Sequence, residues 1–250
     1  MQIILLRGLA REAAHWLDFP AQLQQTLGEN CRIHLVDFPG CGKYFNHTAL
    51  TSVTAMTEHA RADIDIATMA ARKESVYLVG ISMGGMVALD WAQRYPNELR
   101  GVALINSSAG NQPFWWRLRP AAWATMIRAL FSAANTREAQ VLNIVSNHSA
   151  DYAQHLNQWL SIQQQRPISC ATIVTMLRAA AQFHPQPTCA VDGLVLASER
   201  DRMVSVRASE AIARQFNWPI EKHPTAGHDL PMDDSGWLAQ KLAGWVKTLC

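Results

Sequence analysis

This sequence of 250 residues lacks several features that would assign it to other protein classes. Its longest basic cluster is the dipeptide Arg72-Lys73 and its formal net charge is only +2, so the positive stripe typical of nucleic-acid-binding proteins is missing. No apolar run approaches the roughly 18 residues that a membrane-spanning helix needs. The amino-terminal residues also lack a charged segment followed by an apolar one, the pattern of a secretory signal. We therefore expect a globular protein of the cytoplasm without a membrane span.

Cysteine is scarce and irregularly spaced. The five cysteines are odd in number and form no Cys-x-x-Cys pair, which argues against a disulfide framework and against a structural zinc site; they are Cys31, Cys41, Cys170, Cys189 and Cys250. This pattern indicates a reducing compartment. No metal ligand set and no cofactor motif is found, so we predict neither a metal nor a cofactor.

Short apolar runs without polar alternation recur along the chain and end at glycine or polar turns. They cover residues 3–6, 33–36, 76–79, 102–105 and 194–197, and a last strand is expected near residues 220–223. Strands that are buried on both faces have this composition, because helices cover both sides of a parallel sheet. Segments of helical spacing lie between the runs, for example residues 83–94. The alternation predicts an α/β fold with a mostly parallel, doubly wound sheet.

One long segment interrupts this alternation. From about residue 107 to residue 187 the spacing is helical and no strand is predicted; the expected helices cover residues 121–131, 136–146, 150–164 and 169–182. Such a length is too great for a simple connection. We predict a core of residues 1–106 and 191–250 and an inserted helical lid of residues 107–190.

The strongest chemical signal is Gly-Ile-Ser-Met-Gly at residues 80–84, directly after a predicted strand and directly before a predicted helix. This is the G-x-S-x-G pattern in the context that gives it meaning, because the serine of a sharp strand-to-helix turn projects from the carboxyl end of the sheet. The two glycines allow strand and helix to approach closely. Ser82 is therefore the candidate nucleophile.

A serine hydroxyl needs a base, and the base needs a carboxylate to orient it. His228 follows the predicted last strand and comes after the serine and the acid in chain order, so it is the candidate base; His223 is the alternative. Asp201 lies in the turn after the predicted strand 194–197, and its rival there is Glu199. Asp201 would otherwise serve only as the cap of the next helix.

An oxyanion hole requires two backbone N–H groups that point at the developing negative charge. We expect one from Met83, the residue after the nucleophile, and one from Leu9, in the loop after the first strand. Gly8 would permit the tight turn of that loop.

At these residues the chain resembles the α/β-hydrolase family over nearly its whole length. Leu5-Leu6-Arg7-Gly8 is similar to the family's first strand and oxyanion loop, residues 37–42 to its D-x-P-G-x-G turn, and Gly227-His228 to its catalytic histidine loop. In length and layout the chain looks like compact bacterial carboxylesterases such as the pimeloyl-carrier-protein methyl esterases, and like a menaquinone-pathway lyase with the same triad. Arg7 departs from the family, which usually has histidine there.

Two of these positions admit more than one role. Arg7 would either pack within its loop or bind an anionic group of the substrate. Asp37 would contact the substrate or stabilise its own turn, and the second role is commoner for aspartate. Cys41 in the same turn is interpreted as structural.

The predicted lid is basic. Residues 107–190 hold six arginines, no lysine and two acids, a formal charge of +4; the arginines are Arg117, Arg119, Arg128, Arg137, Arg166 and Arg178. They would dock an acidic carrier protein or an anionic acyl group, or form an ordinary solvated surface. Phe114, Trp115 and Trp116 would line an acyl pocket or pack the lid onto the sheet.

These features predict a serine hydrolase that cleaves a carboxylic ester or thioester through an acyl-enzyme, with Ser82, Asp201 and His228 as the triad. A lyase or carbon–carbon hydrolase with the same triad is the alternative, and a binding protein that keeps only the fold is a third interpretation. The expected partner is a small acyl ester, free or attached to an acidic carrier protein.

Overall fold

In the computed structural model, which describes residues 1–148 and 151–249, six strands form one parallel sheet in the order β2-β1-β3-β4-β5-β6. Each pair of neighbours is parallel. The strands are β1 (Gln2–Leu6), β2 (Arg32–Val36), β3 (Val76–Ile81), β4 (Gly101–Ile105), β5 (Gly193–Ser198) and β6 (Ile220–His223). The predicted α/β class is confirmed, and every predicted strand is present within two residues of its expected ends.

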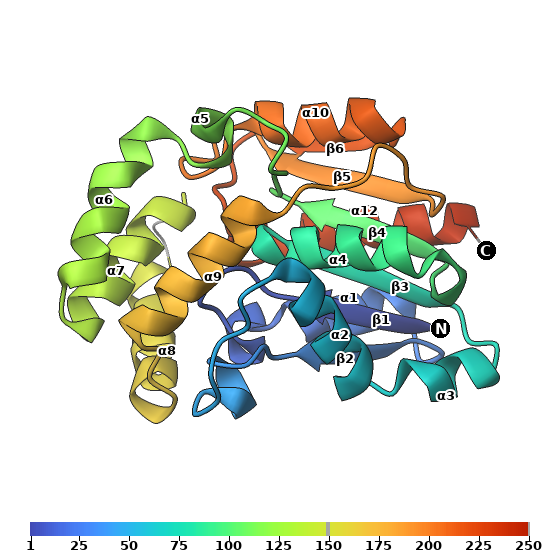
Figure 1. Ribbon diagram of the computed structural model, residues 1–250, viewed down its shortest axis with the longest axis horizontal. Coiled ribbons are helices and arrows are strands. Elements are labelled where there is room, and N and C mark those ends of the chain that lie inside the picture. The colour runs from blue at the N-terminus through green and yellow to red at the C-terminus, as the bar shows by residue number, and fades with distance from the viewer. Residues whose placement is uncertain (149–150, 250) are drawn as a thin grey trace.

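The sheet is buried on both faces because alternate side chains of each strand point to opposite sides. Ile3 and Leu5 of β1 belong to one apolar cluster, which includes residues of α1 (Phe19–Leu27) and α12 (Ser235–Leu249). Ile4 and Leu6 belong to a second cluster on the other face, with residues of α2 (Val53–Asp63), α4 (Met83–Arg94) and α10 (Val206–Phe216). Figure 1 shows these helices as layers on the two sides of the sheet. Continuous apolar runs thus reflect burial on two sides.

The segment between β4 and β5 is helical, as its spacing predicted. It contains α5 (Phe114–Arg117), α6 (Pro120–Phe131), α7 (Ala134–Val145), α8 (Tyr152–Gln165) and α9 (Cys170–Gln182). The short α5 was not predicted, and Ala150, the expected first residue of the third helix, lies outside the described residues. We call residues 107–190 the helical insertion. Figure 1 shows it at the end of the sheet opposite to the two chain termini.

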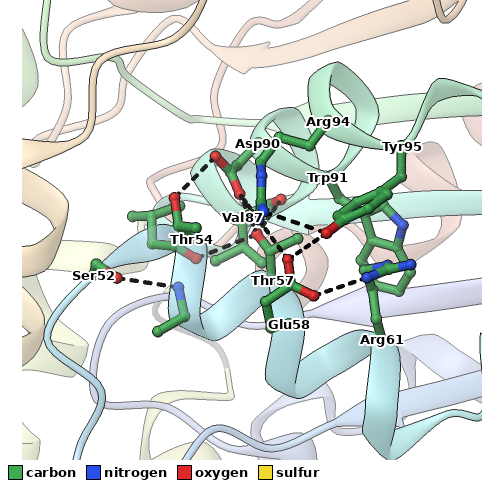
Figure 2. A network of polar contacts seen from close by, with 12 residues as sticks. Ser52, Thr54, Thr57, Glu58, Arg61, Val87, Asp90, Trp91, Arg94 and Tyr95 are labelled. Atoms are coloured by element: carbon green, nitrogen blue, oxygen red, sulfur yellow. Dashed lines mark hydrogen bonds and ion pairs between the residues drawn. The ribbon is translucent and has the colours of Figure 1, made fainter.

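Helix α4 is fixed to α2 by a polar network that includes a buried carboxylate (Figure 2). Asp90 of α4 accepts hydrogen bonds from Thr57 at 2.7 Å and from Thr54 at 3.4 Å. At the carboxyl end of α4, Tyr95 donates to Glu58 of α2 at 2.6 Å and Arg94 forms an ion pair with it. A buried carboxylate is costly unless it has such partners. The network therefore sets the position of the helix that begins directly after Ser82.

None of the helices found in residues 1–148 and 151–249 combines the length and the apolar character needed to cross a membrane.

Candidate active site

Ser82 stands at a sharp turn between β3 and α4. Its backbone is left-handed, with φ 56° and ψ −120°, a region that residues other than glycine rarely adopt. The Ser82 N–H donates to the carbonyl of Ile105 at 2.9 Å, which extends the ladder between β3 and β4 by one residue. Strain of this kind persists only where the surroundings enforce it, and it is common at functional sites.

The glycines on both sides of Ser82 are required by close packing. A Cβ atom on Gly84 would lie 2.1 Å from the carbonyl oxygen of Leu6, and one on Gly80 would lie 2.3 Å from the carbonyl oxygen of Gly84. Only glycine lets α4 begin so close to β1 and β3. The G-x-S-x-G motif is therefore a steric condition for the turn that presents the serine.

His228 and Asp201 are in direct contact. His228 Nδ1 lies 2.7 Å from Asp201 Oδ2, and both side chains are buried. The other carboxylate oxygen, Asp201 Oδ1, accepts from the N–H groups of Met203 at 2.7 Å and Val204 at 2.9 Å. Asp201 thus stabilises its own turn and orients the imidazole. The alternative role, as cap of the next helix, is wrong, because α10 is capped by Ser205.

The pKa of His228 is raised by its carboxylate neighbours. Burial alone lowers the pKa, but the charge of Asp201 and its hydrogen bond outweigh burial, and the pKa lies above the ordinary value of 6.5. Among the other charges nearby, Asp229 raises the pKa of His228 and Arg7 lowers it. With Nδ1 engaged by Asp201, Nε2 is the nitrogen that is left to act as a base.

Asn106 connects the loops that hold these residues. Its side-chain amide donates to the carbonyl of His228 at 2.9 Å and to that of Gly227 at 3.3 Å. Its side-chain oxygen accepts from the N–H of Ser198 at 2.8 Å, at the end of the strand that precedes Asp201. Asn106 directly follows Ile105, whose carbonyl accepts from the N–H of Ser82. The buried Asn106 therefore links the turn of Ser82 to the end of β5 and to the loop of His228.

The loop after β1 lies against the serine. A Cβ atom on Gly8 would be 3.2 Å from Ser82 Cβ and 3.7 Å from Ser82 Oγ, so any larger residue would crowd the hydroxyl. Leu9 follows in this loop and is half-buried, while Met83 is the first, buried residue of α4. The two amides predicted for the oxyanion hole therefore belong to segments on either side of Ser82.

Arg7 has a definite partner. Its guanidinium forms two hydrogen bonds with Asp229, at 2.6 Å and 3.1 Å, and both side chains are buried. The guanidinium carbon also lies 4.8 Å from the centre of the Trp16 ring. Of the two roles considered for Arg7, the structure supports packing between loops, and substrate binding stays a prediction. Asp229 directly follows His228, which is the signal that could have marked it.

The alternatives to the acid and the base lie in other contacts. His223 Nε2 is 3.1 Å from Asp234, and His223 Nδ1 accepts from the N–H of Ala226 at 2.9 Å. Glu199 is exposed. Asp37 accepts from the N–H groups of Ala13 at 2.7 Å and Lys43 at 2.9 Å, which supports its turn-stabilising role.

Cys41 is enclosed in the core. Burial, together with the charges of Asp37 and Glu12, raises the pKa of Cys41 to about 12, so its thiol stays protonated near neutrality. This supports the structural interpretation of Cys41. Within the two described ranges, no group of three or more histidine, cysteine or acidic residues is arranged to hold a metal ion.

The aromatic residues at the start of the insertion face outward. Phe114 and Trp115 are exposed by half or more, and Trp116 is half-buried. An open cavity of about 920 Å³ lies nearby, between α6, the end of α7 and the turn of Asp201. Its lining includes three arginines and two acidic residues: Arg119, Arg200, Arg202, Glu199 and Asp201. The acyl pocket predicted from Phe114, Trp115 and Trp116 stays a prediction.

Comparison with known proteins shows the family to which the chain belongs. A model of the alpha/beta hydrolase family matches residues 3–241. The chain is 25% identical over 223 residues to a pimeloyl-(acyl-carrier protein) methyl ester esterase of Chromobacterium violaceum, a match that covers 89% of this chain and 76% of that protein. It is 26% identical over 191 residues to the Yersinia enterocolitica protein of the same description, covering 76% of this chain and 62% of that protein.

A solved structure of a thermophilic esterase from Thermogutta terrifontis is similar over all of this chain and 90% of its own, with a TM-score of 0.74 and 17% identity. At that identity the likeness is one of fold. The carboxyl edge of the sheet thus holds a strained serine and a histidine–aspartate pair on a fold that esterases share.

Proposed function

Because the chain belongs to the alpha/beta hydrolase family, we propose that it hydrolyses a carboxylic ester or thioester through an acyl-enzyme formed on Ser82. The observation on which this rests is the buried contact of 2.7 Å between His228 and Asp201, in a loop that Asn106 ties to the strand beside Ser82. A scaffold without catalytic function has no physical need for a buried charged pair beside a strained serine.

In the first half of the reaction, His228 Nε2 accepts the Ser82 proton while the serine oxygen attacks the carbonyl carbon of the ester. Asp201 stabilises the imidazolium that forms and holds the ring in the required tautomer. The imidazolium then gives its proton to the leaving alcohol or thiol. An acyl group remains on Ser82 Oγ.

In the second half, His228 activates a water molecule that attacks the acyl carbon, and the acid leaves as Ser82 regains its proton. The backbone N–H groups of Leu9 and Met83 stabilise the negative oxygen in both halves. The nearness of Gly8 to Ser82 Oγ supports this assignment, because it brings the loop of Leu9 beside the reacting atom.

We further propose that the helical insertion acts as a lid over the core formed by residues 1–106 and 191–250, and that the acyl ester is presented by an acidic carrier protein in the cytoplasm. The two esterase relatives act, by their descriptions, on an acyl-carrier-protein ester. The exposed arginines of the insertion, Arg119, Arg128 and Arg178, supply the complementary charge.

The direct test is Ser82→Ala, assayed with p-nitrophenyl esters of graded acyl length and with a fluorophosphonate probe. We expect loss of both turnover and labelling, because each needs the serine oxygen. Ser161→Ala, at an exposed serine of α8, is the matched control and should keep both activities. Circular dichroism should be unchanged in the two variants. Persistent turnover by Ser82→Ala would contradict the proposal.

The same panel separates esterase from lyase or carbon–carbon hydrolase chemistry. An esterase accumulates an acyl-serine, which mass spectrometry detects as a mass increase on the peptide of Ser82 after brief exposure to substrate. Turnover of a carbon acid without any acyl-serine would favour the lyase.

A further inference from the structure

The ion pair of Arg7 and Asp229 joins two loops that adjoin the candidate active site. Arg7 precedes Gly8, whose Cβ position lies 3.7 Å from Ser82 Oγ, and Asp229 follows His228. Two parallel hydrogen bonds, at 2.6 Å and 3.1 Å, fix the orientation of the two groups as well as their distance. Arg7 is therefore one residue from the glycine that lies against Ser82, and Asp229 is one residue from the proposed base.

We propose that Arg7 and Asp229 are positioning residues that set the separation between the oxyanion loop and the base His228. The inference rests on the proposed roles of Ser82 and His228. The pair does not itself contact substrate. It holds the predicted Leu9 amide and the imidazole in the one arrangement in which both reach the reacting carbonyl.

Stability alone is a poor explanation for this pair. Removing two charges from water costs about as much as their attraction returns, so two apolar side chains would stabilise the fold as well. The backbone of the histidine loop is also anchored independently, because the N–H of Asp229 donates to the carbonyl of Val145 at 2.8 Å. The side-chain pair adds orientation to a loop that is already held in place.

The charges of the pair act on His228 with opposite signs. Asp229 raises the pKa of His228 and Arg7 lowers it. His223, paired with Asp234, is a titratable neighbour of this loop and accepts from the N–H of Ala226 at 2.9 Å. Charged groups at the loop are also Asp201 and Asp233, whose Oδ2 accepts from the N–H of Gly227 at 2.6 Å. These two remain when the pair is changed. Loss of one partner therefore leaves a charge of known sign beside the base.

This arrangement gives a test that separates positioning from general damage. The acidic limb of the pH profile of kcat/KM reports protonation of the base in the free enzyme. Arg7→Met leaves Asp229 unbalanced and should move that limb to higher pH, while Asp229→Asn leaves Arg7 and should move it to lower pH. Both should lower kcat on the order of tenfold to a hundredfold, the usual effect of a misplaced reacting group.

Arg7→Lys serves as the control for charge, because it keeps the positive charge but loses the fork of two hydrogen bonds. It should lower kcat while leaving the acidic limb near its wild-type position. It also keeps the test available if Arg7→Met does not fold, which thermal unfolding would reveal. The proposal would be overturned if the acidic limb moved in the same direction in Arg7→Met and Asp229→Asn. It would also be overturned if Arg7→Lys and Asp229→Asn kept the wild-type kcat. Activity retained in Ser82→Ala would instead refute the catalytic assignment.

A separate feature, the outer face of α5 and α6, exposes a cluster of large apolar side chains. Of the seven such side chains exposed within the described residues, five lie here: Phe114, Trp115, Trp123, Ile127 and Phe131. Trp123, Ile127 and Phe131 are spaced by four and so share one side of α6. Phe131 is 84% exposed. We call these five residues the aromatic face. Clusters of this kind mark interaction surfaces in soluble proteins.

The charges around the aromatic face select among possible partners. Arg119 and Arg128 are the exposed charged side chains of residues 107–137, a stretch that contains no acidic residue. Two copies of the chain that met through this face would bring like charges together. An acidic carrier protein would match the arginines but would leave the aromatic side chains without an apolar partner. A bilayer that contains anionic lipids offers both an apolar interior and negative headgroups.

We propose that the aromatic face rests on an anionic membrane surface. Binding is measured by sedimentation with vesicles of phosphatidylglycerol and phosphatidylcholine, and with vesicles of phosphatidylcholine alone. The protein should bind the first and bind them less at high salt. Ile127→Ser and Phe131→Ser should weaken binding roughly tenfold each, which is the loss expected for one buried apolar side chain.

Leu177→Ser, an exposed leucine of α9 outside the aromatic face, is the matched control and should bind like the wild type. Arg128→Gln should weaken binding only to the anionic vesicles. Hydrolysis of a soluble p-nitrophenyl ester should be unchanged in Ile127→Ser and Phe131→Ser. Failure to bind either vesicle, or a dimer in light scattering that Phe131→Ser dissociates, would overturn the proposal. Binding only to an acidic carrier protein would overturn it as well.

Discussion

The carboxyl edge of the sheet and the outer face of the helical insertion differ in how their side chains are partnered. At the sheet edge, buried polar groups such as Asn106, Asp201 and Arg7 each have two or more short polar contacts. On the outer face of α6, Phe131 and Ile127 face solvent. The first region is built to hold a few atoms in one arrangement, and the second is built to meet another surface.

The difference predicts where the chain tolerates change. Gly84→Ala should produce the largest effect, because the added Cβ atom would lie 2.1 Å from the carbonyl oxygen of Leu6. We expect a loss of about 3 kcal/mol or more in the free energy of unfolding, or no soluble protein. Gly244→Ala, in α12, is the control: no described atom outside its own helix backbone and chain neighbours lies within 4 Å of its added Cβ. It should be neutral or stabilise by up to about 1 kcal/mol. Equal unfolding curves for the two variants would contradict the packing argument.

Two asparagines allow a closer comparison of the regions. Asn106→Ala leaves the N–H of Ser198 and the carbonyl of His228 without their buried partner, which should cost about 2–4 kcal/mol and at least tenfold in kcat/KM. Asn147 makes a similar bridge from the insertion to the carbonyls of Arg200 and Thr225, at 3.1 Å and 3.0 Å, but in contact with solvent. Asn147→Ala should cost about 1 kcal/mol or less. Urea unfolding measures the free energy of unfolding of both variants. Equal losses in the two variants would contradict the predicted difference between the regions.

The pKa values of two buried histidines are shifted in opposite directions. Burial and the arginines near it, Arg11 first, lower the pKa of His15 well below 6.5, whereas Asp201 raises the pKa of His228 above that value. We therefore expect kcat/KM to fall with decreasing pH from an inflection above 6.5, because protonated His228 cannot act as a base. Asp201→Asn removes the raising charge and should move the inflection below that of the wild type, at much lower activity.

The same shifts have opposite consequences for stability. For His228, whose pKa is raised on folding, the contribution is fully present below pH 6.5 and is lost as the pH rises through the folded pKa. For His15, whose pKa is lowered on folding, stability decreases as the pH falls below 6.5. Proton NMR of the two imidazole rings over pH 5–9 measures both pKa values. A His15 ring that titrates at an ordinary value would contradict its burial beside arginines.

The smallest effect is expected on the aromatic face. Phe131→Ser removes a side chain that is 84% exposed, so the free energy of unfolding should change by about 0.5 kcal/mol or less. In contrast, Trp159→Ala, in the fully buried centre of the insertion, should cost about 3–5 kcal/mol locally. Calorimetry of the two variants tests whether the insertion has a core of its own. A marked loss in Phe131→Ser would show that its side chain packs inside the protein.

The fold could be predicted from the sequence because its signals are local. Residues 3–6 and 102–105 are apolar without interruption, and the structure has β1 and β4 there, buried on both faces. The turn of Ser82 was equally local, since Gly80 and Gly84 flank it. The order of the six strands was not predictable, because it depends on which strands pair across long stretches of chain.

The site was predictable only in part, for the same reason. His228 and Asp201 were predicted from chain order, and the two side chains lie 2.7 Å apart; their catalytic roles stay a prediction. Asn106 and the pair of Arg7 with Asp229 were missed, because hydrogen bonds across 92 to 222 residues leave no mark in local spacing. The sequence shows that the insertion is basic, but it does not show which arginines bind within the chain. Arg117 donates to carbonyls of α9 and Arg166 pairs with Glu12, so both bind within the chain.

The apolar core of the helical insertion packs against the loops that hold Asp201 and His228. Its apolar cluster, centred on Trp159 and Leu142, is packed against Met203, two residues after Asp201, and Met232, four residues after His228. Warming that loosens these helices would free both loops while the β-strands are still intact. The heat-inactivation midpoint should therefore lie several degrees below the midpoint of strand melting, and brief cooling should restore activity.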